Sequence, residues 1–296
     1  MQKKYFEINV DKYVEGKNFS VYRPSSLGNP KDNSVMFIME AYVDKYAKNF
    51  EKVNECLVFW PESVPVPQSI ADKHAVVLRE NTHLSYCKFY EENDINNYPK
   101  KEKVDFTDGY FISPEAKVGE GTVIMPGVYI GGDVVIGKNC YIGAGTKIVG
   151  EVTIGDDFVI RENGVIGSDS ITTDRDENGK AVTMPQFGGV VIGDNVRAAS
   201  NVVICRGAID DTVIGSGTRI GDCNLISHNN VIGEDCFIIG SVMTFGSVTV
   251  GKNCMLSGNS SIRNGVTIGD NTIVGLGAVV VKDIPANSVV KGNPAK

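Results

Sequence analysis

Apolar, mostly β-branched residues recur at every sixth position along most of the chain after residue 111. The first run holds ten positions in unbroken register: Ile112, Val118, Ile124, Ile130, Ile136, Ile142, Ile148, Ile154, Ile160 and Ile166. After an interruption the pattern returns at Ile192, Ala198 and Ile204, and four extra residues near Gly207 then reset its phase. The last run holds twelve positions: Ile214, Ile220, Ile226, Ile232, Ile238, Thr244, Val250, Leu256, Ile262, Ile268, Val274 and Val280. A six-residue period of this length predicts a parallel β-helix.

Each hexad also predicts which side chains face inward and where the chain turns. The repeated residue points into the prism and stacks on its equivalent three hexads away, at about the 4.8 Å spacing of neighbouring strands. Small residues two positions earlier also face inward, among them Cys140, Cys236 and Cys254. The third residue after the repeated one needs a positive φ at each corner, which Gly, Asn and Asp tolerate. Such residues recur at that position: Gly121, Asn139, Gly145, Asp157, Asn195, Gly217, Asp235, Asn253, Asn271 and Gly277.

Two segments depart from the six-residue pattern. The larger covers residues 168 to 189 and contains the turn sequence Asp176-Glu-Asn-Gly. The smaller is a bulge from Gly207 to Asp210. A solenoid accommodates insertions as surface loops, and loops on a rigid scaffold commonly form binding surfaces. We therefore expect function close to these two segments.

The first 104 residues lack the period and predict a separate small α/β domain. Strand-like segments at 34–38, 56–60 and 74–78 alternate with helix-like segments at 41–52 and 82–91. A polar linker at 96–103 joins this part to the rod. The predicted fold is therefore mainly β, with an α/β domain at 1–104 and a parallel β-helix at 105–296.

Composition excludes several classes of protein. The formal net charge of −7 and the absence of a long basic tract argue against nucleic acid as a partner. The sequence holds neither an apolar run of membrane-span length nor a signal peptide, so we expect a cytoplasmic protein without a transmembrane segment. The seven cysteines form no C-x-x-C pair, which predicts neither a disulfide framework nor a zinc site. We expect no bound metal and no permanently bound cofactor.

His228 is the only histidine after residue 83 and lies in the sequence Ile226-Ser-His-Asn-Asn-Val-Ile-Gly. Two positions after the repeated Ile226, it should project outward beside the corner residue Asn229. Imidazole has an unperturbed pKa suited to general base catalysis near neutral pH. Gly246 lies one coil further along, where its backbone N–H could stabilise an oxyanion. The alternative is a surface histidine on a solenoid corner; His74 and His83 are interpreted as structural or surface residues.

Three motifs resemble those of the UDP-3-O-acylglucosamine N-acyltransferases, which are left-handed β-helix hexapeptide-repeat enzymes. The segment Met184-Pro-Gln-Phe-Gly-Gly-Val-Val-Ile-Gly-Asp resembles the family's exit from its long loop. The segment Ile204-Cys-Arg-Gly-Ala-Ile-Asp-Asp-Thr is similar to the family's I-D-R-G-A-x-x-D-T and includes the bulge. The His228 segment is similar to I-A-H-N-V-x-I-G. The resemblance implies a homotrimer with active sites between subunits, His228 as base and Gly246 as oxyanion donor.

The resemblance also assigns candidate binding residues. In the N-terminal domain it implies Phe37 as a base-stacking aromatic residue, whereas the residue pattern itself favours a core residue of its strand. In the rod it indicates Asn229 and Asp222 as substrate-binding residues. Asp210 and Asp211 in the bulge are further candidates, which could orient a substrate amine or hydroxyl or could simply cap the turn. The C-terminal segment ending at Lys296 looks more like coenzyme-A-dependent sugar acetyltransferases than like this family. This suggests two cofactor-binding residues, Lys291 and Gly277, although Lys291 could equally be a solvated terminal charge.

Several positions depart from the family pattern close to these residues. The family's motif D-N-x-x-Q-I-A-H becomes Gly221-Asp-Cys-Asn-Leu-Ile-Ser-His228, so two polar residues are lost. A second active-site histidine of the family falls near Gly265, and its uracil-contacting asparagine is Glu40 here. The departures therefore affect residues expected to contact the acceptor, whereas His228 and Gly246, expected to carry out acyl transfer, are kept.

The sequence predicts an N-acyltransferase that moves an acyl group from acyl-CoA or acyl carrier protein to a nucleotide-linked amino sugar, for lipopolysaccharide or surface polysaccharide synthesis. One alternative is the lipid A enzyme itself, acting on UDP-3-O-(3-hydroxyacyl)glucosamine. A second is a non-catalytic scaffold or sugar-binding protein on the same rod. A γ-type carbonic anhydrase would need three zinc-binding histidines, whereas the rod carries one. A sugar nucleotidyltransferase would need a glycine-rich nucleotide motif near residue 10, and the sequence has none there.

Overall fold

The computed structural model describes residues 3–98 and 101–296. Contacts within the chain divide it into two compact units. Unit 1 comprises Met1–Tyr98 and Ile171–Phe187, and unit 2 comprises Pro99–Ser170 and Gly188–Lys296. Most of the long insertion in the hexad pattern therefore belongs to unit 1, although the sequence placed it with the rod. Pro99 and Lys100 of the expected linker lie outside the described residues.

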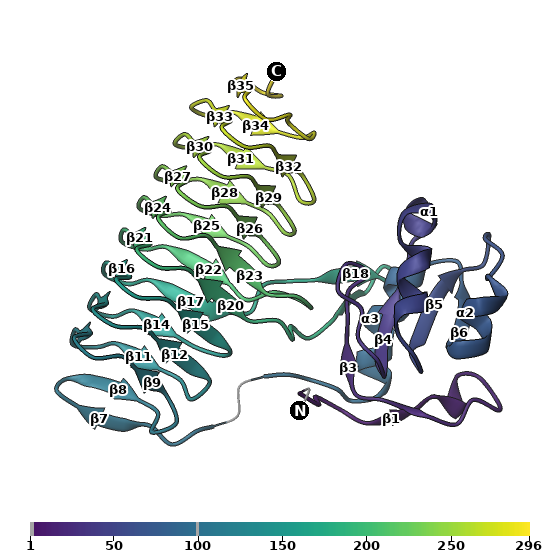
Figure 1. Cartoon of the computed structure of the whole chain (residues 1–296). Coiled ribbons are helices and arrows are strands. Elements are labelled where there is room, and N and C mark those ends of the chain that lie inside the picture. Colours follow the sequence, from purple (N-terminus) through teal and green to yellow (C-terminus); the bar gives the residue numbers. More distant parts are fainter. Residues whose placement is uncertain (1–2, 99–100) are drawn as a thin grey trace. The chain divides into compact units, whose positions relative to one another are not determined.

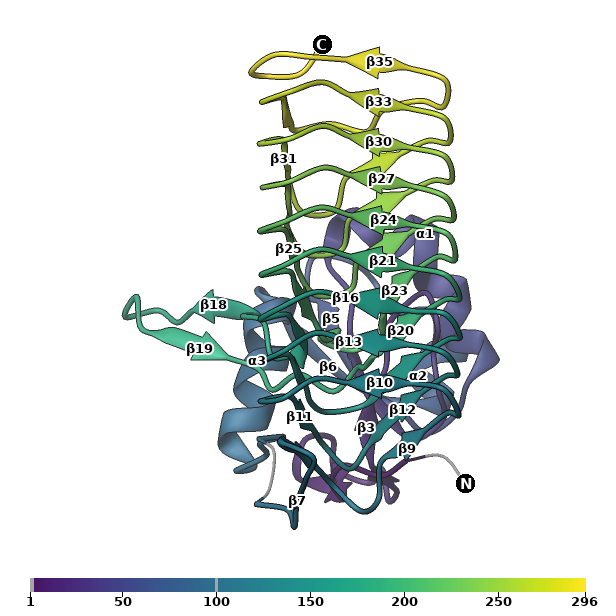
Figure 2. The ribbon, with the colours of Figure 1, turned by 90° about the vertical axis from the view of Figure 1, so that its left-hand side faces the viewer.

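Unit 2 is a parallel β-helix with three sheets, which we call faces 1, 2 and 3 (Figure 1). Face 1 is the front ladder in Figure 2 and holds β10 (Val123–Ile124), β13 (Tyr141–Ile142), β16 (Val159–Ile160), β21 (Arg197–Ala198), β24 (Arg219–Ile220), β27 (Phe237–Ile238), β30 (Met255–Leu256), β33 (Ile273–Val274) and β35 (Val289–Val290). Face 2 holds β7 (Asp105–Thr107), β8 (Tyr110–Ile112), β11 (Tyr129–Ile130), β14 (Lys147–Ile148), β17 (Val165–Ser168), β22 (Val203–Cys205), β25 (Leu225–Ile226), β28 (Met243–Thr244), β31 (Ser261–Ile262) and β34 (Val279–Val280). Face 3 holds β9 (Lys117–Val118), β12 (Val134–Ile136), β15 (Val152–Ile154), β20 (Val190–Ile192), β23 (Thr212–Ile214), β26 (Val231–Ile232), β29 (Thr249–Val250) and β32 (Thr267–Ile268).

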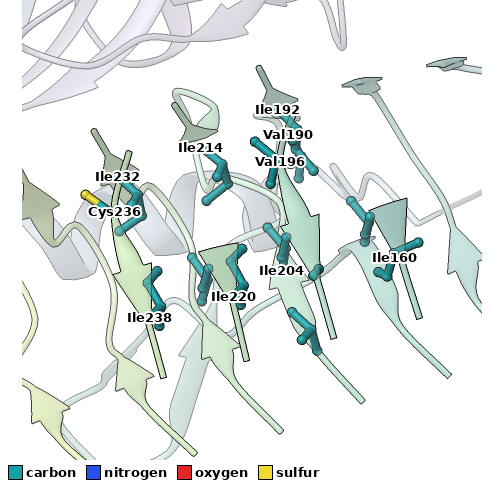
Figure 3. Packing of buried hydrophobic residues seen from close by; sticks show 14 of the residues in the cluster. Ile160, Val190, Ile192, Val196, Ile204, Ile214, Ile220, Ile232, Cys236 and Ile238 are labelled. Carbon is teal, nitrogen blue, oxygen red and sulfur yellow. The ribbon is translucent and has the colours of Figure 1, made fainter. Parts of the chain in front are cut away.

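The hexad pattern explains both the core and the corners of this rod. The repeated aliphatic residues stack on their equivalents in the next coil inside the prism, as Ile192 on Ile214 and Ile220 on Ile238 illustrate (Figure 3). The predicted inward cysteines Cys140, Cys236 and Cys254 are buried and fill the core as small apolar side chains. All ten predicted corner residues have a positive φ, from 53° at Asn139 to 77° at Gly121. The sequence therefore predicted the register of the rod correctly.

Unit 1 is built on a parallel four-stranded sheet in the order β3-β4-β5-β6. Its strands are β3 (Arg23–Pro24), β4 (Ser34–Phe37), β5 (Leu57–Pro61) and β6 (Ala75–Arg79), with a separate antiparallel pair of β1 (Ile8–Asn9) and β2 (Ser20–Val21). Its helices are α1 (Val43–Tyr46), α2 (Gln68–Lys73) and α3 (Thr82–Glu92), with 3-10 turns η1 (Val10–Lys12), η2 (Glu40–Tyr42) and η3 (Ala47–Lys52). The helix expected at 41–52 is thus mostly the tighter 3-10 form, which occurs in short pieces.

The long insertion contributes a hairpin to unit 1, formed by β18 (Thr173–Arg175) and β19 (Ala181–Thr183). This hairpin packs against α3. The His83 Nδ1 atom lies 2.9 Å from Asp174 Oδ2, and the Lys88 ammonium lies 2.9 Å from the Glu177 carboxylate. His83 is thus a structural residue, as predicted. His74 is buried, with Nδ1 accepting from the Cys56 N–H and Nε2 donating to the Phe50 carbonyl, and burial lowers its pKa.

We expect Asp174→Asn to weaken unit 1 in a pH-dependent way. Partial burial works to raise the pKa of Asp174, but donors from His83 and Arg175 outweigh it and lower that pKa below its ordinary value of 3.8. A lowered carboxyl pKa contributes stability that is present above the unfolded value and is lost as the pH falls through the folded value. The variant should therefore lose up to about 1 kcal/mol of unfolding free energy at pH 7. The difference should shrink below pH 3.8.

The single tryptophan, Trp60, is buried in unit 1, so its fluorescence during urea unfolding reports on this unit. Glu177→Gln is the control, because its ion pair with Lys88 is more exposed and should contribute less. An Asp174→Asn effect that is equally large at pH 7 and pH 3 would contradict the assignment to ionisation of this carboxyl group.

Candidate active site on the rod

His228 lies at the corner between faces 2 and 3, where the chain passes from β25 to β26. The repeated residue Ile226 is buried in the core, whereas His228 is half-buried and projects from the corner. The next residue, Asn229, has a φ of 57° and turns the chain. The hexad pattern therefore fixes the position of the imidazole on the scaffold.

The hydrogen bonds of Asn229 determine which nitrogen of His228 carries the proton. Asn229 Nδ2 donates to the Asp210 carbonyl at 2.7 Å, and Asn229 Oδ1 accepts from the Ala208 N–H at 2.9 Å. These two bonds fix the orientation of the amide. Because His228 Nδ1 lies 3.0 Å from Asn229 Oδ1, which is only an acceptor, Nδ1 must be the donor. The neutral imidazole then has its lone pair on Nε2, as a general base requires.

The bulge at Gly207–Asp210 is attached directly to the histidine corner through Asn229. A side chain at position 207 would place Cβ 1.6 Å from the Asp210 carbonyl oxygen, so this tight turn requires glycine. The amide of Asn229 bridges the two ends of the turn, at Ala208 and Asp210. The change of phase in the sequence thus marks a structure that orients His228. Asn229, predicted to bind substrate, is already committed to these contacts.

Gly246 lies directly beside the imidazole, as the 18-residue separation predicts. A Cβ at position 246 would lie 2.3 Å from His228 Cε1 and 2.4 Å from Nε2, so only glycine fits with the ring in this position. Gly246 is buried because the ring covers it. Among the described residues, its backbone N–H has no hydrogen-bond acceptor. An unpaired N–H beside a basic nitrogen can interact with negative charge that develops during a reaction.

Asn230 is a residue of this corner that the sequence interpretation missed. Its buried Nδ2 donates to the Ser227 carbonyl at 2.7 Å and to the Phe245 carbonyl at 2.9 Å. These carbonyls belong to the peptide groups immediately before His228 and Gly246, so one amide holds the two coils together. An asparagine at an inward position, where the repeat otherwise favours small apolar residues, was the available signal.

A buried arginine lies beneath the bulge and was also missed. Arg206 Nε donates to the Gly188 carbonyl at 2.6 Å, and its guanidinium lies 4.0 Å from Asp169. Partial burial raises the pKa of Asp169, and the charge of Arg206 opposes this shift. Ser227, beside His228, contacts Ser170 through their hydroxyl groups at 3.1 Å. The two ends of the long insertion and the bulge thus support the same corner.

The predicted acidic substrate residues lie in different places. Asp210 is in the bulge, and its carbonyl contacts Asn229. Asp211 Oδ1 accepts from the Gly189 N–H at 2.6 Å and closes the junction with the insertion. Asp222 lies at the corner between faces 1 and 2, where its Oδ1 accepts from the Ser200 N–H. The structure therefore groups Asp210 and Asp211 with His228 and places Asp222 on another edge of the rod.

The other predicted residues of the rod, Gly277 and Lys291, do not lie at the His228 corner. Gly277 and Lys291 follow β33 and β35 of face 1, in the last coils of the rod. Phe37 belongs to unit 1, where its ring lies 4.8 Å from that of Tyr86 and 5.2 Å from that of His83. Its ring is half-buried, which is compatible both with a core residue and with a residue that stacks on a nucleotide base.

Within 3–98 and 101–296, no three His, Cys, Asp or Glu side chains gather as potential metal ligands. Over the same residues, no helix is long and apolar enough to cross a membrane.

Comparisons with known sequences match the rod and point to one group of enzymes. Residues 115–150 match the family described as bacterial transferase hexapeptide (six repeats), and residues 133–168 and 247–282 match the hexapeptide repeat of succinyl-transferase. The chain is 47% identical over 83 residues to the UDP-3-O-acylglucosamine N-acyltransferase of Coxiella burnetii, which covers 28% of this chain and 24% of the relative. It is 45% identical over 76 residues to that of Francisella tularensis subsp. holarctica, covering 26% and 23%. The matches thus span about a quarter of these relatives.

Solved structures of acyltransferases share the fold. The UDP-N-acetylglucosamine acyltransferase of Bacteroides fragilis superposes with a TM-score of 0.58 at 28% identity, covering 65% of this chain and 73% of that one. The UDP-N-acetylglucosamine acyltransferase of Francisella novicida gives 0.57 at 25% identity, covering 63% and 66%. Together with the repeat matches, these structures confirm the predicted left-handed parallel β-helix.

Proposed function

We propose that this chain, a member of the hexapeptide-repeat family that includes the UDP-3-O-acylglucosamine N-acyltransferases, transfers an acyl group from a thioester to the amine of a nucleotide-linked amino sugar. The observation that carries the proposal is the contact between a histidine with its Nε2 lone pair available and a glycine whose N–H has no acceptor among the described residues. The short matched region of the curated relatives supports the class of reaction. That this chain uses substrates like those of the relatives is part of the proposal.

The geometry accounts for the two requirements of amine acylation. An amine must lose a proton as its nitrogen bonds to the thioester carbonyl carbon, and His228 Nε2 takes that proton. The carbonyl oxygen then becomes negative, and the Gly246 N–H is our proposed donor to it. Collapse of the tetrahedral intermediate breaks the carbon–sulfur bond. The imidazolium returns its proton to the leaving thiolate, so His228 ends the cycle neutral.

Substrate contacts are proposed for the residues around this corner and in unit 1. Asp210 and Asp211 adjoin the bulge beside His228, where a carboxylate suits a sugar hydroxyl or the substrate amine. Phe37 is proposed to stack on the nucleotide base, and Asp222, Gly277 and Lys291 remain proposed contacts for the acceptor and for coenzyme A. We further propose a homotrimer and a cytoplasmic reaction serving lipopolysaccharide or another surface glycan, with either acyl-CoA or acyl carrier protein as donor.

Turnover assays with defined substrates test this proposal. Purified protein is incubated with acetyl-CoA, longer acyl-CoAs or acyl carrier protein and with UDP- or dTDP-linked amino sugars, and the products are analysed by mass spectrometry. We expect the mass of one acyl group to be added to the amino sugar and one free thiol to be released per turnover. Absence of transfer with every pair, while His228→Ala leaves the cellular phenotype unchanged, would support a non-catalytic scaffold instead.

The lipid A enzyme is the second candidate, because the matched curated relatives bear that name. The same assay separates it from the first candidate. Activity confined to acylated UDP-glucosamine with acyl carrier protein would identify the lipid A reaction. Activity with a non-acylated amino sugar would favour another surface glycan.

We expect Asn229→Gly to lower kcat while leaving the backbone turn unstrained. Glycine accepts the φ of 57°, so the variant removes only the amide that orients His228 and ties it to the bulge. Loss of one orienting hydrogen bond corresponds to a decrease of about tenfold or more. Steady-state kinetics with a saturating donor measure the effect.

Asn201→Gly is the matched control for this variant. Asn201 also has a left-handed φ, at 58°, but occupies a corner between faces 1 and 2. The control should retain kcat. Equal losses of activity in both variants would show that the corner asparagines serve only the stability of the rod.

A further inference from the structure

The outer surface of face 1 contains a hollow of about 560 Å³ that lies away from the His228 corner. It spans the neighbouring strands β16, β21, β24 and β27, which follow one another up the front ladder in Figure 2. Three arginines line it, namely Arg161, Arg197 and Arg219. A concentration of arginine is unexpected on a chain with a net charge of −7. The hollow is therefore a candidate for recognition of an anion.

Two of these arginines lie side by side, and within the described residues neither forms an ion pair with a carboxylate. Arg197 and Arg219 are register partners on adjacent parallel strands, so their side chains leave the same face about 4.8 Å apart. Like charges directly opposite each other on neighbouring strands are destabilising. An anion bound between the two guanidinium groups would remove this repulsion.

The hydrogen bonds of the three arginines differ. Arg219 donates to the carbonyls of Asn195, Gly217 and Thr218, which hold its side chain in place without neutralising it. Arg161 lies over the Tyr141 ring and pairs with Glu162 at 3.3 Å. Within the described part of the chain, the guanidinium of Arg197 has no hydrogen-bond or ion-pair partner. Arg197 is therefore the guanidinium available to a ligand, and Arg219 is held rigidly beside it.

The rest of the lining provides both space and an apolar wall. Small residues, Ala199, Gly221 and Gly240, keep the floor of the hollow low. Phe237 and Ile239 border it and leave 52% and 42% of their surfaces exposed. The carboxylate in the lining, Asp222, already accepts from the Ser200 N–H. The lining thus combines an exposed aromatic ring with two guanidinium groups that form no ion pair among the described residues.

We propose that this hollow binds a phosphate-bearing ligand, with Arg197 and Arg219 contacting the phosphate and Phe237 contacting the group attached to it. Guanidinium groups bind phosphate through paired, charge-assisted hydrogen bonds, and a pair of them suits a phosphate or a diphosphate ester. The proposal deepens the proposed function, on which it rests, by assigning a phosphate contact to residues of face 1 that lie away from His228. Nucleotide sugars and coenzyme A both present this chemistry.

Titration calorimetry on the full chain tests the proposal with four probes: inorganic phosphate, pyrophosphate, UDP and coenzyme A. We expect pyrophosphate and at least one of the two esters to bind, with an affinity that falls as salt rises. Arg197→Ala should weaken binding about tenfold or more. Phe237→Ala should weaken the ester but not pyrophosphate. Whether UDP or coenzyme A binds more tightly identifies the source of the phosphate.

Lys138→Ala is the charge-matched control, because it removes one exposed positive charge at another corner of the same rod. It should bind all probes as the unsubstituted chain does. Two results would overturn the proposal: no binding of any probe, or equal binding by the Arg197→Ala and Lys138→Ala variants. Light scattering supplies a third result that would overturn it. If Arg197→Ala changes the assembly of the protein without changing its affinity for phosphate, this face is an interface and not a phosphate site. None of these measurements depends on acyl transfer, so the proposed function can fail independently.

Discussion

Replacing His228 with alanine is expected to lower kcat for acyl transfer about 10²- to 10⁴-fold, the range typical of losing a general base. The loss should fall mainly on kcat, because the role proposed for the imidazole is to take the proton that leaves the amine in the transition state. The fold should persist, since His228 is half-buried at a corner and Ile226 carries the core contact of its hexad. Steady-state kinetics together with the melting temperature separate the two effects.

Lys282→Ala is the positional control for His228→Ala. Lys282 holds the same place in its hexad, three coils along the same edge of the rod, and is exposed. It should leave kcat unchanged. Full activity of the His228→Ala variant, with an intact rod, would remove His228 from the reaction and leave binding or scaffolding as the role of this corner.

The rod could be predicted in detail because its signal is local and repeated. Each hexad carries its own inward residue, such as Ile160 or Ile214, and its own corner residue, so register follows directly from sequence. Asn139 and Gly121 both adopt the positive φ that their position requires. The same regularity predicts that His228 and Gly246 are neighbours, because a separation of three hexads places them on adjacent coils. The structure shows this contact.

The parts that escaped prediction depend on contacts between distant residues. No periodicity shows that the hairpin of the long insertion packs in unit 1, where Asp174 contacts His83 across 91 positions. Asn229 resembles a substrate-binding residue in sequence, yet its amide is occupied by the bulge. Asn230 spans two coils through the carbonyls of Ser227 and Phe245. Such roles depend on which backbone groups are left unpaired, and only the folded chain shows this.

The bulge near Gly207 shows which features of the site follow from the sequence and which follow only from the folded structure. The sequence shows that four residues are added and that a loop must leave the rod there. It does not show that this loop closes onto Asn229 and thereby fixes the proton on His228 Nδ1. The bulge thus orients His228 without supplying a candidate catalytic group itself.

Gly246→Ala is expected to reduce kcat about 10²-fold or more although it adds a single methyl group. Gly246 has no left-handed φ, so alanine introduces no backbone strain. Its Cβ would lie 2.3 Å from His228 Cε1, so the imidazole must leave its position beside the glycine N–H. The variant therefore disturbs the base and the oxyanion donor together, whereas His228→Ala removes only the base.

Gly258→Ala is the matched control, and a double variant identifies the cause. Gly258 holds the same position in its hexad, but its Cβ would meet the Gly240 carbonyl at 3.2 Å, a contact that small shifts relieve. We expect Gly258→Ala to retain most of its activity. The His228→Ala/Gly246→Ala variant should recover the melting temperature lost in Gly246→Ala, because the clash needs the imidazole, while kcat stays low. If Gly246→Ala instead keeps full activity, the ring can move without cost, and its contact with Gly246 does not define the catalytic geometry.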